Sequence, residues 1–169
     1  MQKFTEISAN DFNANVCRLI GNEWMLITAG TKDHYNTMTA AWGGIGFLWN
    51  MPVVFTFVRP QRFTFEFTEK HPTFTLSFFD KKYKKALSYC GAKSGRDVDK
   101  AKETGLEVLE TKDGNIAFEQ ASVIIESTKL YFDDIKKANF IIPEIDNKVY
   151  PLEDYHRMYI GRIDHIYKK

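Results

Sequence analysis

Apolar and polar positions along this chain predict β-strands more often than helices. Runs rich in β-branched and aromatic residues, bounded by Gly, Pro or polar residues, are typical of strands in a packed sheet. The predicted strands cover residues 23–30, 53–58, 73–80, 121–134 and 157–169. An extended segment of small residues at 37–42 follows a polar turn or loop at 31–36, and we expect Gly43 and Gly44 to break it.

The segments between these strands include two predicted helices. Residues 81–95 place basic side chains along one side, and residues 95–105 end in a glycine, which commonly follows the last helical residue. Residues 147–156 are predicted to be a loop. Residues 62–70 alternate Phe with Thr and Glu, and this period of two predicts a strand. Because strands outnumber helices, we expect a mainly β architecture, an antiparallel, Greek-key-like barrel with short helical insertions.

The composition is that of an ordinary globular protein. The chain has 169 residues, 44% hydrophobic and 27% charged, which predicts one domain over residues 1–169. The aromatic fraction of 15% favours strands, and the net charge of +1 argues against a broad nucleic-acid-binding surface. Two cysteines without CxxC spacing, a polar first segment and no apolar run of about 18 residues predict a cytoplasmic protein without a disulfide scaffold or membrane span.

Several enzyme classes lack their motifs in this sequence. There is no G-x-S-x-G nucleophile elbow, no H-E-x-x-H zinc motif, no phosphate-binding P-loop and no G-x-G-x-x-G turn of a dinucleotide-binding domain. The four histidines, His34, His71, His156 and His165, show no close pairing. We expect each to be a surface or loop residue rather than a metal ligand, so the sequence predicts no metal site.

Two loops carry residues suited to a phosphate group. The candidates are Arg59, Arg62 and Thr64 in RPQRFT, and Ser94, Arg96 and Lys100 in SGRDVDK. Arginine makes forked, charge-assisted bonds to phosphate oxygens, and the start of a helix favours an anion. Each loop also has an ordinary interpretation, as two solvated arginines in a turn and as a capped surface helix.

The segment NTMTAAWGG, residues 36–44, suggests a flat ligand. Its small side chains let a ligand approach the backbone, and Trp42 offers a large planar face. Phe78 and Phe79 provide a second aromatic pair further along the chain. Together with the basic loops, these residues indicate a planar ligand that carries a phosphate.

The order of these motifs resembles one protein family. The segments are NTMTAAWGG, FVRPQRFTFEF, FTLSFFD, KKALSYCGAKSGRDVDK and HRMYIGRI. In this order and spacing they resemble the flavin reductase-like, FMN-binding split-barrel proteins, and among those the flavoredoxin-type branch. The resemblance extends from Asn15 to Tyr167. It implies a split β-barrel that forms a homodimer, with FMN in a cleft near the dimer interface, and it favours a short helix at residues 62–70.

The resemblance also implies roles for individual residues. Asn36, Thr37, Met38, Thr39, Ala40 and Trp42 would line the isoalloxazine ring and ribityl chain, and Arg59, Arg62, Phe63 and Thr64 would form the phosphate-side loop. Ser77, Phe78 and Phe79 would pass beside the flavin, and Lys84, Ser94, Arg96 and Lys100 would close the pocket. His156 would lie where the nicotinamide approaches, which makes it the candidate catalytic residue.

Three functional hypotheses follow from these features. The leading one is a flavoprotein oxidoreductase that reduces FMN by hydride transfer from NADH or NADPH, chemistry that needs no protein nucleophile. The second is a non-enzymatic FMN electron carrier reduced by a partner protein. The third is a split barrel that binds haem or another flat molecule, with His156 as a ligand. The basic loops count against the third hypothesis.

Overall fold

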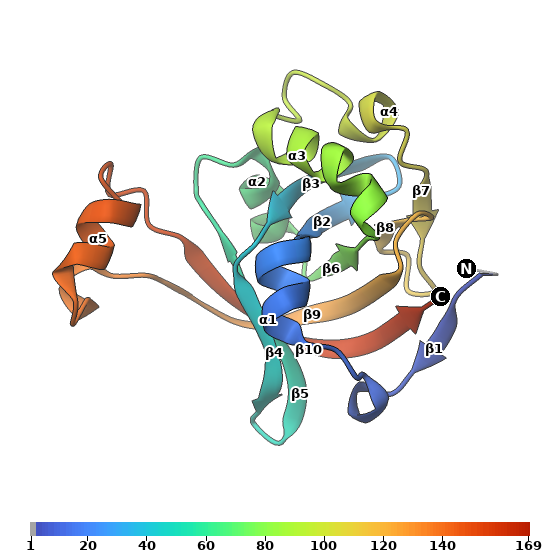
Figure 1. Cartoon of the computed structure of the whole chain (residues 1–169), viewed down its shortest axis with the longest axis horizontal. Coiled ribbons are helices and arrows are strands. Elements are labelled where there is room, and N and C mark those ends of the chain that lie inside the picture. Colours follow the sequence, from blue (N-terminus) through green and yellow to red (C-terminus); the bar gives the residue numbers. More distant parts are fainter. Residues whose placement is uncertain (1–2) are drawn as a thin grey trace.

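The structure, a computed structural model that describes residues 3–169, is built on one curved antiparallel sheet (Figure 1). The strands are β1 (Thr5–Ile7), β2 (Met25–Thr31), β3 (His34–Ala40), β4 (Gly43–Leu48), β5 (Met51–Val58), β6 (Thr73–Phe78), β7 (Val108–Glu110), β8 (Ile116–Phe118), β9 (Val123–Asp134) and β10 (Arg157–Lys168). Their order in space is β3-β2-β6-β9-β10-β5-β4, with β1 on β10 and a separate β7–β8 hairpin. The two edge strands, β3 and β4, do not pair with each other, so the barrel is not closed. The sheet is therefore an open, split barrel, as predicted.

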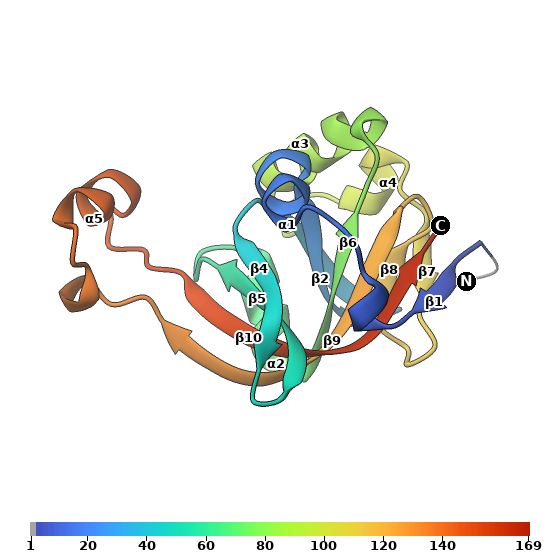
Figure 2. The ribbon, with the colours of Figure 1, turned by 60° about the horizontal axis from the view of Figure 1, so that its bottom comes forward.

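Short helices cover the ends and one side of the sheet (Figures 1 and 2). They are α1 (Val16–Arg18), α2 (Phe63–Lys70), α3 (Lys84–Ala92), α4 (Lys100–Thr104) and α5 (Pro143–Val149), with single turns η1 (Ala9–Asp11), η2 (Leu19–Glu23), η3 (Lys81–Tyr83) and η4 (Lys137–Asn139). The predicted helices at 81–95 and 95–105 correspond to α3 and α4. Gly105 ends α4 with a positive φ of 68°, a conformation that glycine adopts without steric cost.

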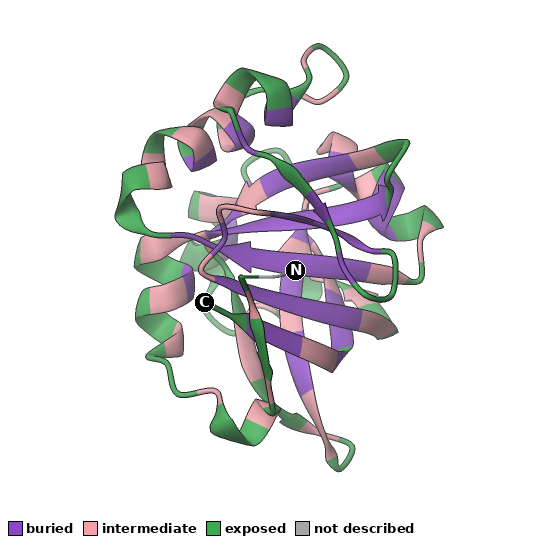
Figure 3. Ribbon diagram, turned by 90° about the vertical axis from the view of Figure 1, so that its right-hand side faces the viewer, coloured by how far each residue is buried: buried purple, intermediate pink, exposed green. Residues whose placement is uncertain are grey.

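Both faces of the central strands are buried, and the helices expose their outer sides (Figure 3). In β2, Met25 and Ile27 join one apolar cluster, whereas Leu26 joins a second cluster. The first cluster fills the inside of the barrel with side chains such as Phe74. The second packs Leu87 of α3 against the sheet. The period of two in β2 therefore supplies two cores instead of one core and a solvated face.

Residues 62–70 form a helix, as the resemblance implies and the alternation of phenylalanines does not. In α2 the buried residues are Thr64, Phe67 and Thr68, a spacing of three and four that fits one helical face. Phe63 and Phe67 lie one turn apart with ring centroids at 5.0 Å. The buried Thr68 hydroxyl donates to the Phe65 carbonyl, so its polar group is satisfied. Tertiary packing thus overrides a local pattern that favours a strand.

Gly43 and Gly44 do not interrupt the sheet, which corrects the sequence prediction. Gly43 begins β4 and pairs with Thr56 of β5, so only two residues separate β3 from β4. A Cβ atom on Gly43 would collide with the Phe55 carbonyl oxygen, and its φ is 154°. The glycine is required because β4 approaches β5 closely here.

Two predicted loops are shorter than expected. Residues 31–36 mostly belong to strands, and only Lys32 and Asp33 lie between β2 and β3. The predicted loop at 147–156 starts inside α5. The sequence pattern does not predict β1 or the β7–β8 hairpin, because strands of three residues are too short to show a period of two.

Residues 135–156, called the arm below, project from the sheet between β9 and β10 and carry η4 and α5 (Figures 1 and 2). The arm has its own aromatic contacts, with the Tyr150 and Tyr155 ring centroids 4.8 Å apart. It also exposes large apolar side chains, including Ile141 at 96% and Leu152 at 82%. Among residues 3–169, no helix has both the length and the apolar character needed to cross a bilayer.

Candidate functional site

A cleft of about 450 Å³ opens where the end of β3, the end of β5 and the start of β10 meet. Its lining residues are Met38, Thr39, Ala40, Ala41, Trp42, Phe57, Arg59, Gln61, Arg62 and His156. The small side chains follow one another along β3 and the connection after it, which leaves room next to the backbone. The volume lies within the range of about 300–1,000 Å³ typical of small-molecule sites.

A smaller pocket of about 110 Å³ adjoins this cleft. It is lined by Met38, Gln61, Arg62, Phe63, Thr64, Ala92, Lys93, Ser94 and Lys100. The cleft and the pocket share the lining residues Met38, Gln61 and Arg62, so they adjoin each other, and the pocket is called the narrow end of the cleft below. The narrow end gathers hydroxyl groups and cations from α2, from α4 and from the loop between α3 and α4.

Arg62 and Lys100 are the two cations of the narrow end, and both are held by backbone carbonyls. Arg62 donates to the Gly91 carbonyl at 2.8 Å, and Lys100 Nζ donates to the carbonyls of Thr37 at 2.7 Å and Cys90 at 2.9 Å. Burial, with a smaller contribution from the Arg62 charge, lowers the pKa of Lys100 to about 8. Burial also lowers the pKa of Arg62, as does the charge of Arg59.

Neither of these cations has a carboxylate partner within 4 Å among the described residues. Lys100 is only 6% exposed, so water provides little compensation. Two partly desolvated positive charges that face one small pocket favour an anion there. The α3 carbonyls that accept from them carry only partial negative charge and leave donors available.

Arg59 lies in the wider cleft and is already paired. Its Nη1 donates to Asp154 Oδ2 at 2.5 Å, and its Nη2 donates to the Val149 carbonyl at 3.0 Å. Its guanidinium also lies 5.3 Å from the centre of the Tyr150 ring. All three partners belong to the arm. Arg59 therefore ties the arm to the cleft and has less charge to offer a ligand than Arg62.

His156 and Trp42 form an aromatic wall at the wide end of the cleft. Their ring centroids are 4.8 Å apart, and the planes are tilted by 50°. The Tyr150 hydroxyl and His156 Nδ1 are hydrogen-bonded at 2.9 Å. Burial lowers the pKa of His156 to about 4, and the Arg59 charge adds to this effect. The imidazole is therefore neutral at neutral pH.

Asn36, Thr64 and Gly95 form a tight contact behind the narrow end. The buried Asn36 side chain donates from Nδ2 to Thr64 Oγ1 at 2.7 Å, which joins β3 to α2. A Cβ atom on Gly95 would collide with Asn36 Oδ1, so only glycine lets the loop after α3 come this close. This contact fixes the loop that carries Ser94.

The structure brings most of the predicted site residues together. Met38, Thr39, Ala40, Trp42, Arg59, Arg62 and His156 line the cleft, and Phe63, Thr64, Ser94 and Lys100 line its narrow end. Asn36, Thr37 and Arg96 line a neighbouring hollow of about 370 Å³ that also contacts Lys100.

Four predicted residues lie elsewhere. Ser77 and Phe78 are fully buried in β6. Phe79 and Lys84 line a separate hollow, where Lys84 Nζ donates to the Asn22 carbonyl at 2.6 Å and lies over the Trp24 ring. Lys84 therefore holds η2 in place. The cleft geometry does not support the family-based assignment of these four residues.

Sequence reasoning missed Ala41, Phe57 and Gln61 as lining residues. Ala41 and Gln61 lie inside the segments already singled out, NTMTAAWGG and RPQR. Phe57 had a weaker signal: along β5, Val54, Thr56 and Val58 are buried, so Phe57 must face the other side of the sheet.

Comparisons with known proteins point to one family. The model of the flavin reductase like domain matches residues 17–168, nearly the whole chain. No curated protein sequence gives a significant match.

Solved structures show the same fold. The chain is similar to an FMN-binding domain of a flavin reductases-like enzyme from Shewanella baltica OS155, with 16% identity, a TM-score of 0.70, and coverage of 98% of this chain and 77% of that one. It is similar to flavoredoxin from Methanosarcina acetivorans, with 19% identity, a TM-score of 0.67, and coverage of 98% and 75%. It is also similar to an NADH:FAD oxidoreductase from Streptomyces globisporus C-1027, with 15% identity, a TM-score of 0.67, and coverage of 87% and 75%.

Proposed function

Because the chain belongs to the family of flavin reductase-like domains, and so to flavin-related redox proteins, we propose that it binds FMN in the cleft and catalyses its reduction by NADH or NADPH. The observation that carries the proposal is a pair of cations, the half-buried Arg62 and the buried Lys100, that face the narrow end without a carboxylate partner among the described residues. A terminal phosphate monoester matches this pair, which favours FMN over riboflavin.

The remaining lining residues suit the rest of FMN. Thr39, Ala40 and Ala41 have small side chains, so the backbone beside them can form hydrogen bonds with the polar edge of a flat ring system. Trp42 offers an aromatic surface at the wide end. Thr64 and Ser94 add hydroxyl groups beside the proposed phosphate position. When bound, the flavin would supply the hydride-accepting N5 atom. The chain itself would orient the flavin and exclude water from it.

His156 is proposed to position the nicotinamide. Among the described residues, the ring of His156 is hydrogen-bonded at Nδ1 only, with the Tyr150 hydroxyl, and this bond fixes the ring orientation. As a neutral imidazole it bonds a carboxamide without adding charge to the site. Hydride transfer removes no proton from carbon, so His156 is assigned a binding role and not that of a base.

The proposed assembly is a homodimer in the cytoplasm. The arm supports it, because Ile141, Ile142 and Leu152 are exposed beyond the barrel while the base of the arm contacts Arg59 and His156. Ile142→Lys should then give a monomer in light scattering, whereas Val108→Lys, on the distant β7–β8 hairpin, should not. A monomeric wild-type protein at micromolar concentration, with FMN bound, would contradict the dimer. The proposed cytoplasmic location rests on the two cysteines, Cys17 and Cys90, which are not paired with each other.

Anaerobic stopped-flow tests the activity. FMN-loaded protein is mixed with NADH or NADPH, and flavin bleaching is followed at its visible absorption band. Bleaching by either nucleotide, slowed by deuterium at the transferred position, supports hydride transfer. If neither nucleotide bleaches the flavin, but a reduced electron-transfer protein does, the chain is an FMN electron carrier and the reductase proposal fails. If the protein binds no FMN, both the reductase proposal and the electron-carrier alternative are wrong.

A further inference from the structure

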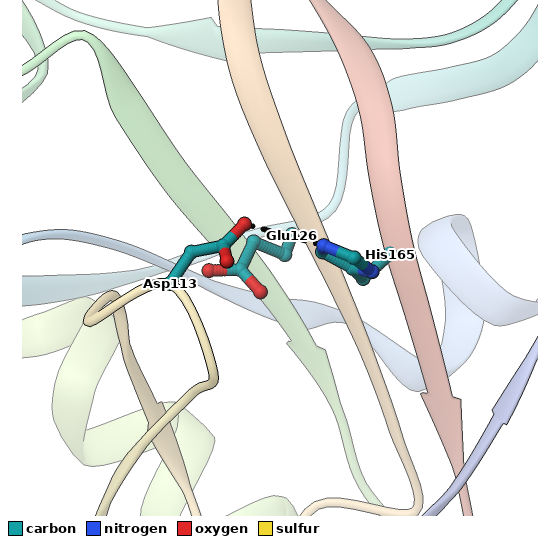
Figure 4. A group of neighbouring side chains, drawn as sticks. All are labelled: Asp113, Glu126 and His165. Carbon is teal, nitrogen blue, oxygen red and sulfur yellow. Dashed lines mark hydrogen bonds and ion pairs between the residues drawn. The ribbon is translucent and has the colours of Figure 1, made fainter.

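A second cluster of polar side chains lies far from the cleft. Asp113, Glu126 and His165 gather beside the β7–β8 hairpin, and their potential ligand atoms all lie within 4.8 Å of one another (Figure 4). His165 follows His156 by nine residues along β10, a separation of roughly 30 Å in an extended strand. The cluster is therefore independent of the proposed flavin site.

Sheet register assembles the cluster from distant parts of the chain. Glu126 on β9 and His165 on β10 are direct cross-strand partners. Asp113 lies in the turn of the β7–β8 hairpin, between Thr111 and Asn115. None of these spacings forms a sequence motif, so the histidine showed no partner in the sequence.

Glu126 is a buried carboxylate that forms no ion pair with a lysine or arginine of the described chain. It is 1% exposed, and no lysine or arginine among the described residues lies within 4 Å of it. Thr111 donates to its Oε1 at 2.5 Å, and Asn115 donates to the same oxygen. Among residues 3–169, its Oε2 accepts from Tyr167 alone, at 3.3 Å, which is long for a hydrogen bond between two oxygens. One buried carboxylate oxygen is thus poorly satisfied and lies within the cluster.

His165 is oriented as metal-binding histidines commonly are. Its Nδ1 is hydrogen-bonded to Glu6 Oε1 on β1 at 2.6 Å, and its Nε2 lies 3.2 Å from Asp113 Oδ2. A carboxylate on one ring nitrogen fixes the tautomer that presents the other nitrogen to an ion. Lys112 Nζ contacts the second Glu6 oxygen at 2.5 Å and holds that carboxylate in place.

We propose that Asp113, Glu126 and His165 bind one divalent transition-metal ion of the Zn²⁺ type, with Glu6 supporting His165. An imidazole with two carboxylates is a donor set for zinc and its neighbours, whereas Ca²⁺ and Mg²⁺ prefer oxygen ligands throughout. Bonds of about 2.1 Å place tetrahedral ligands about 3.4 Å apart, so the present spacing of up to 4.8 Å needs a small closure. Asp113 can supply it because it lies in an exposed hairpin turn.

The proposed ion has a structural role. It fastens the β7–β8 hairpin and, through Glu6, the first strand to the β9–β10 pair. It also places positive charge beside the buried Glu126 side chain. Because it binds only the folded chain, it raises the unfolding temperature, and the rise grows with the logarithm of the ion concentration once that concentration exceeds the Kd.

Calorimetric titration of the whole chain with Zn²⁺ at neutral pH tests this site, with Asp113→Asn and His165→Asn as disrupting variants. Asp33→Asn and His34→Asn are matched controls, because they replace the same residue types at another hairpin. Co²⁺ serves as a spectroscopic probe, since its visible absorption reports ligation by nitrogen and carboxylate. Circular dichroism of each variant without metal checks that it folds.

We expect one Zn²⁺ per chain, at least tenfold weaker binding in either disrupting variant, and no change beyond twofold in the controls. Glu6→Gln should weaken binding on the order of tenfold, the effect of losing an outer carboxylate. Ca²⁺ and Mg²⁺ should bind much more weakly. Absence of stoichiometric binding, or equal affinity in Asp113→Asn and wild type, overturns the proposal and leaves an ordinary ion-pair network. Asp113 is exposed, so this result does not depend on a buried substitution.

Discussion

The two ends of the cleft use the same residue type in different ways. At the narrow end, Arg62 donates to a backbone carbonyl, and Lys100 nearby does the same. At the wide end, Arg59 is paired with Asp154 and also bonds the arm. Both arginines come from the same four-residue loop, and only one of them has an uncompensated charge.

This difference separates anion binding from structural support. A paired arginine offers a ligand little net charge, whereas a desolvated and unpaired one favours an anion strongly. The narrow end is therefore suited to the phosphate, and the wide end to uncharged rings. Arg59 lines the wide end and is bonded to the arm, so it connects the arm to the cleft.

The comparison is tested most strongly by Arg62→Ala. Loss of a charge-assisted bond of about 1.5–3 kcal/mol should weaken FMN binding about 10- to 150-fold. Riboflavin, which has no phosphate, should bind almost as before. Quenching of flavin fluorescence gives both affinities, and Arg18→Ala, an exposed arginine outside the cleft, is the control. Equal losses of affinity for FMN and riboflavin would contradict the assignment of the phosphate to the narrow end.

His156→Ala sharpens the assignment of the wide end. Loss of one hydrogen bond and of the Trp42 contact should raise the nicotinamide concentration needed for half-maximal reduction about tenfold. FMN affinity should change less than threefold, because His156 lies away from the narrow end. Stopped-flow reduction at several nucleotide concentrations measures the first effect and fluorescence the second. A larger loss in FMN affinity than in nicotinamide use contradicts the assignment.

The neutral state of His156 predicts a pH dependence of stability. Its pKa is about 4 when folded, below the ordinary value of 6.5. Between these values the unfolded chain binds a proton that the folded chain excludes, so the free energy of unfolding falls as pH decreases from 6.5 to 4. One proton corresponds to a slope of at most about 1.4 kcal/mol per pH unit. Urea unfolding should show a shallower slope in His156→Gln, and identical slopes would contradict a buried neutral imidazole.

Arg59→Ala should weaken FMN binding much less than Arg62→Ala. Its charge is already balanced by Asp154, so Arg59 adds little net positive charge to the cleft, and FMN affinity should fall about two- to fivefold. Asp154→Asn releases Arg59 and should bring the Arg59→Ala effect closer to that of Arg62→Ala. Fluorescence titration of the single and double variants checks both statements. A loss as large as that of Arg62→Ala in the presence of Asp154 would erase the difference between the two ends.

Much of the site was predictable because its residues are neighbours in sequence. Met38, Thr39 and Ala40 follow one another along β3, and Arg62 and Thr64 start α2. The type of residue, its spacing and the resemblance to a family were sufficient there. For α2 the local period of two was misleading, since buried Thr64 and Thr68 find partners only in the folded protein.

By itself the sequence determined the mainly β architecture, the order of the segments proposed to bind FMN and the residue types available for a phosphate. Only the tertiary structure decided which charges are paired. Arg59 meets Asp154 across 95 positions of the chain, and His165 meets Glu6 across 159. Local patterns report which face of a strand or helix is buried. They carry no information on which distant charge lies opposite, because sheet register and the path of the arm set that distance.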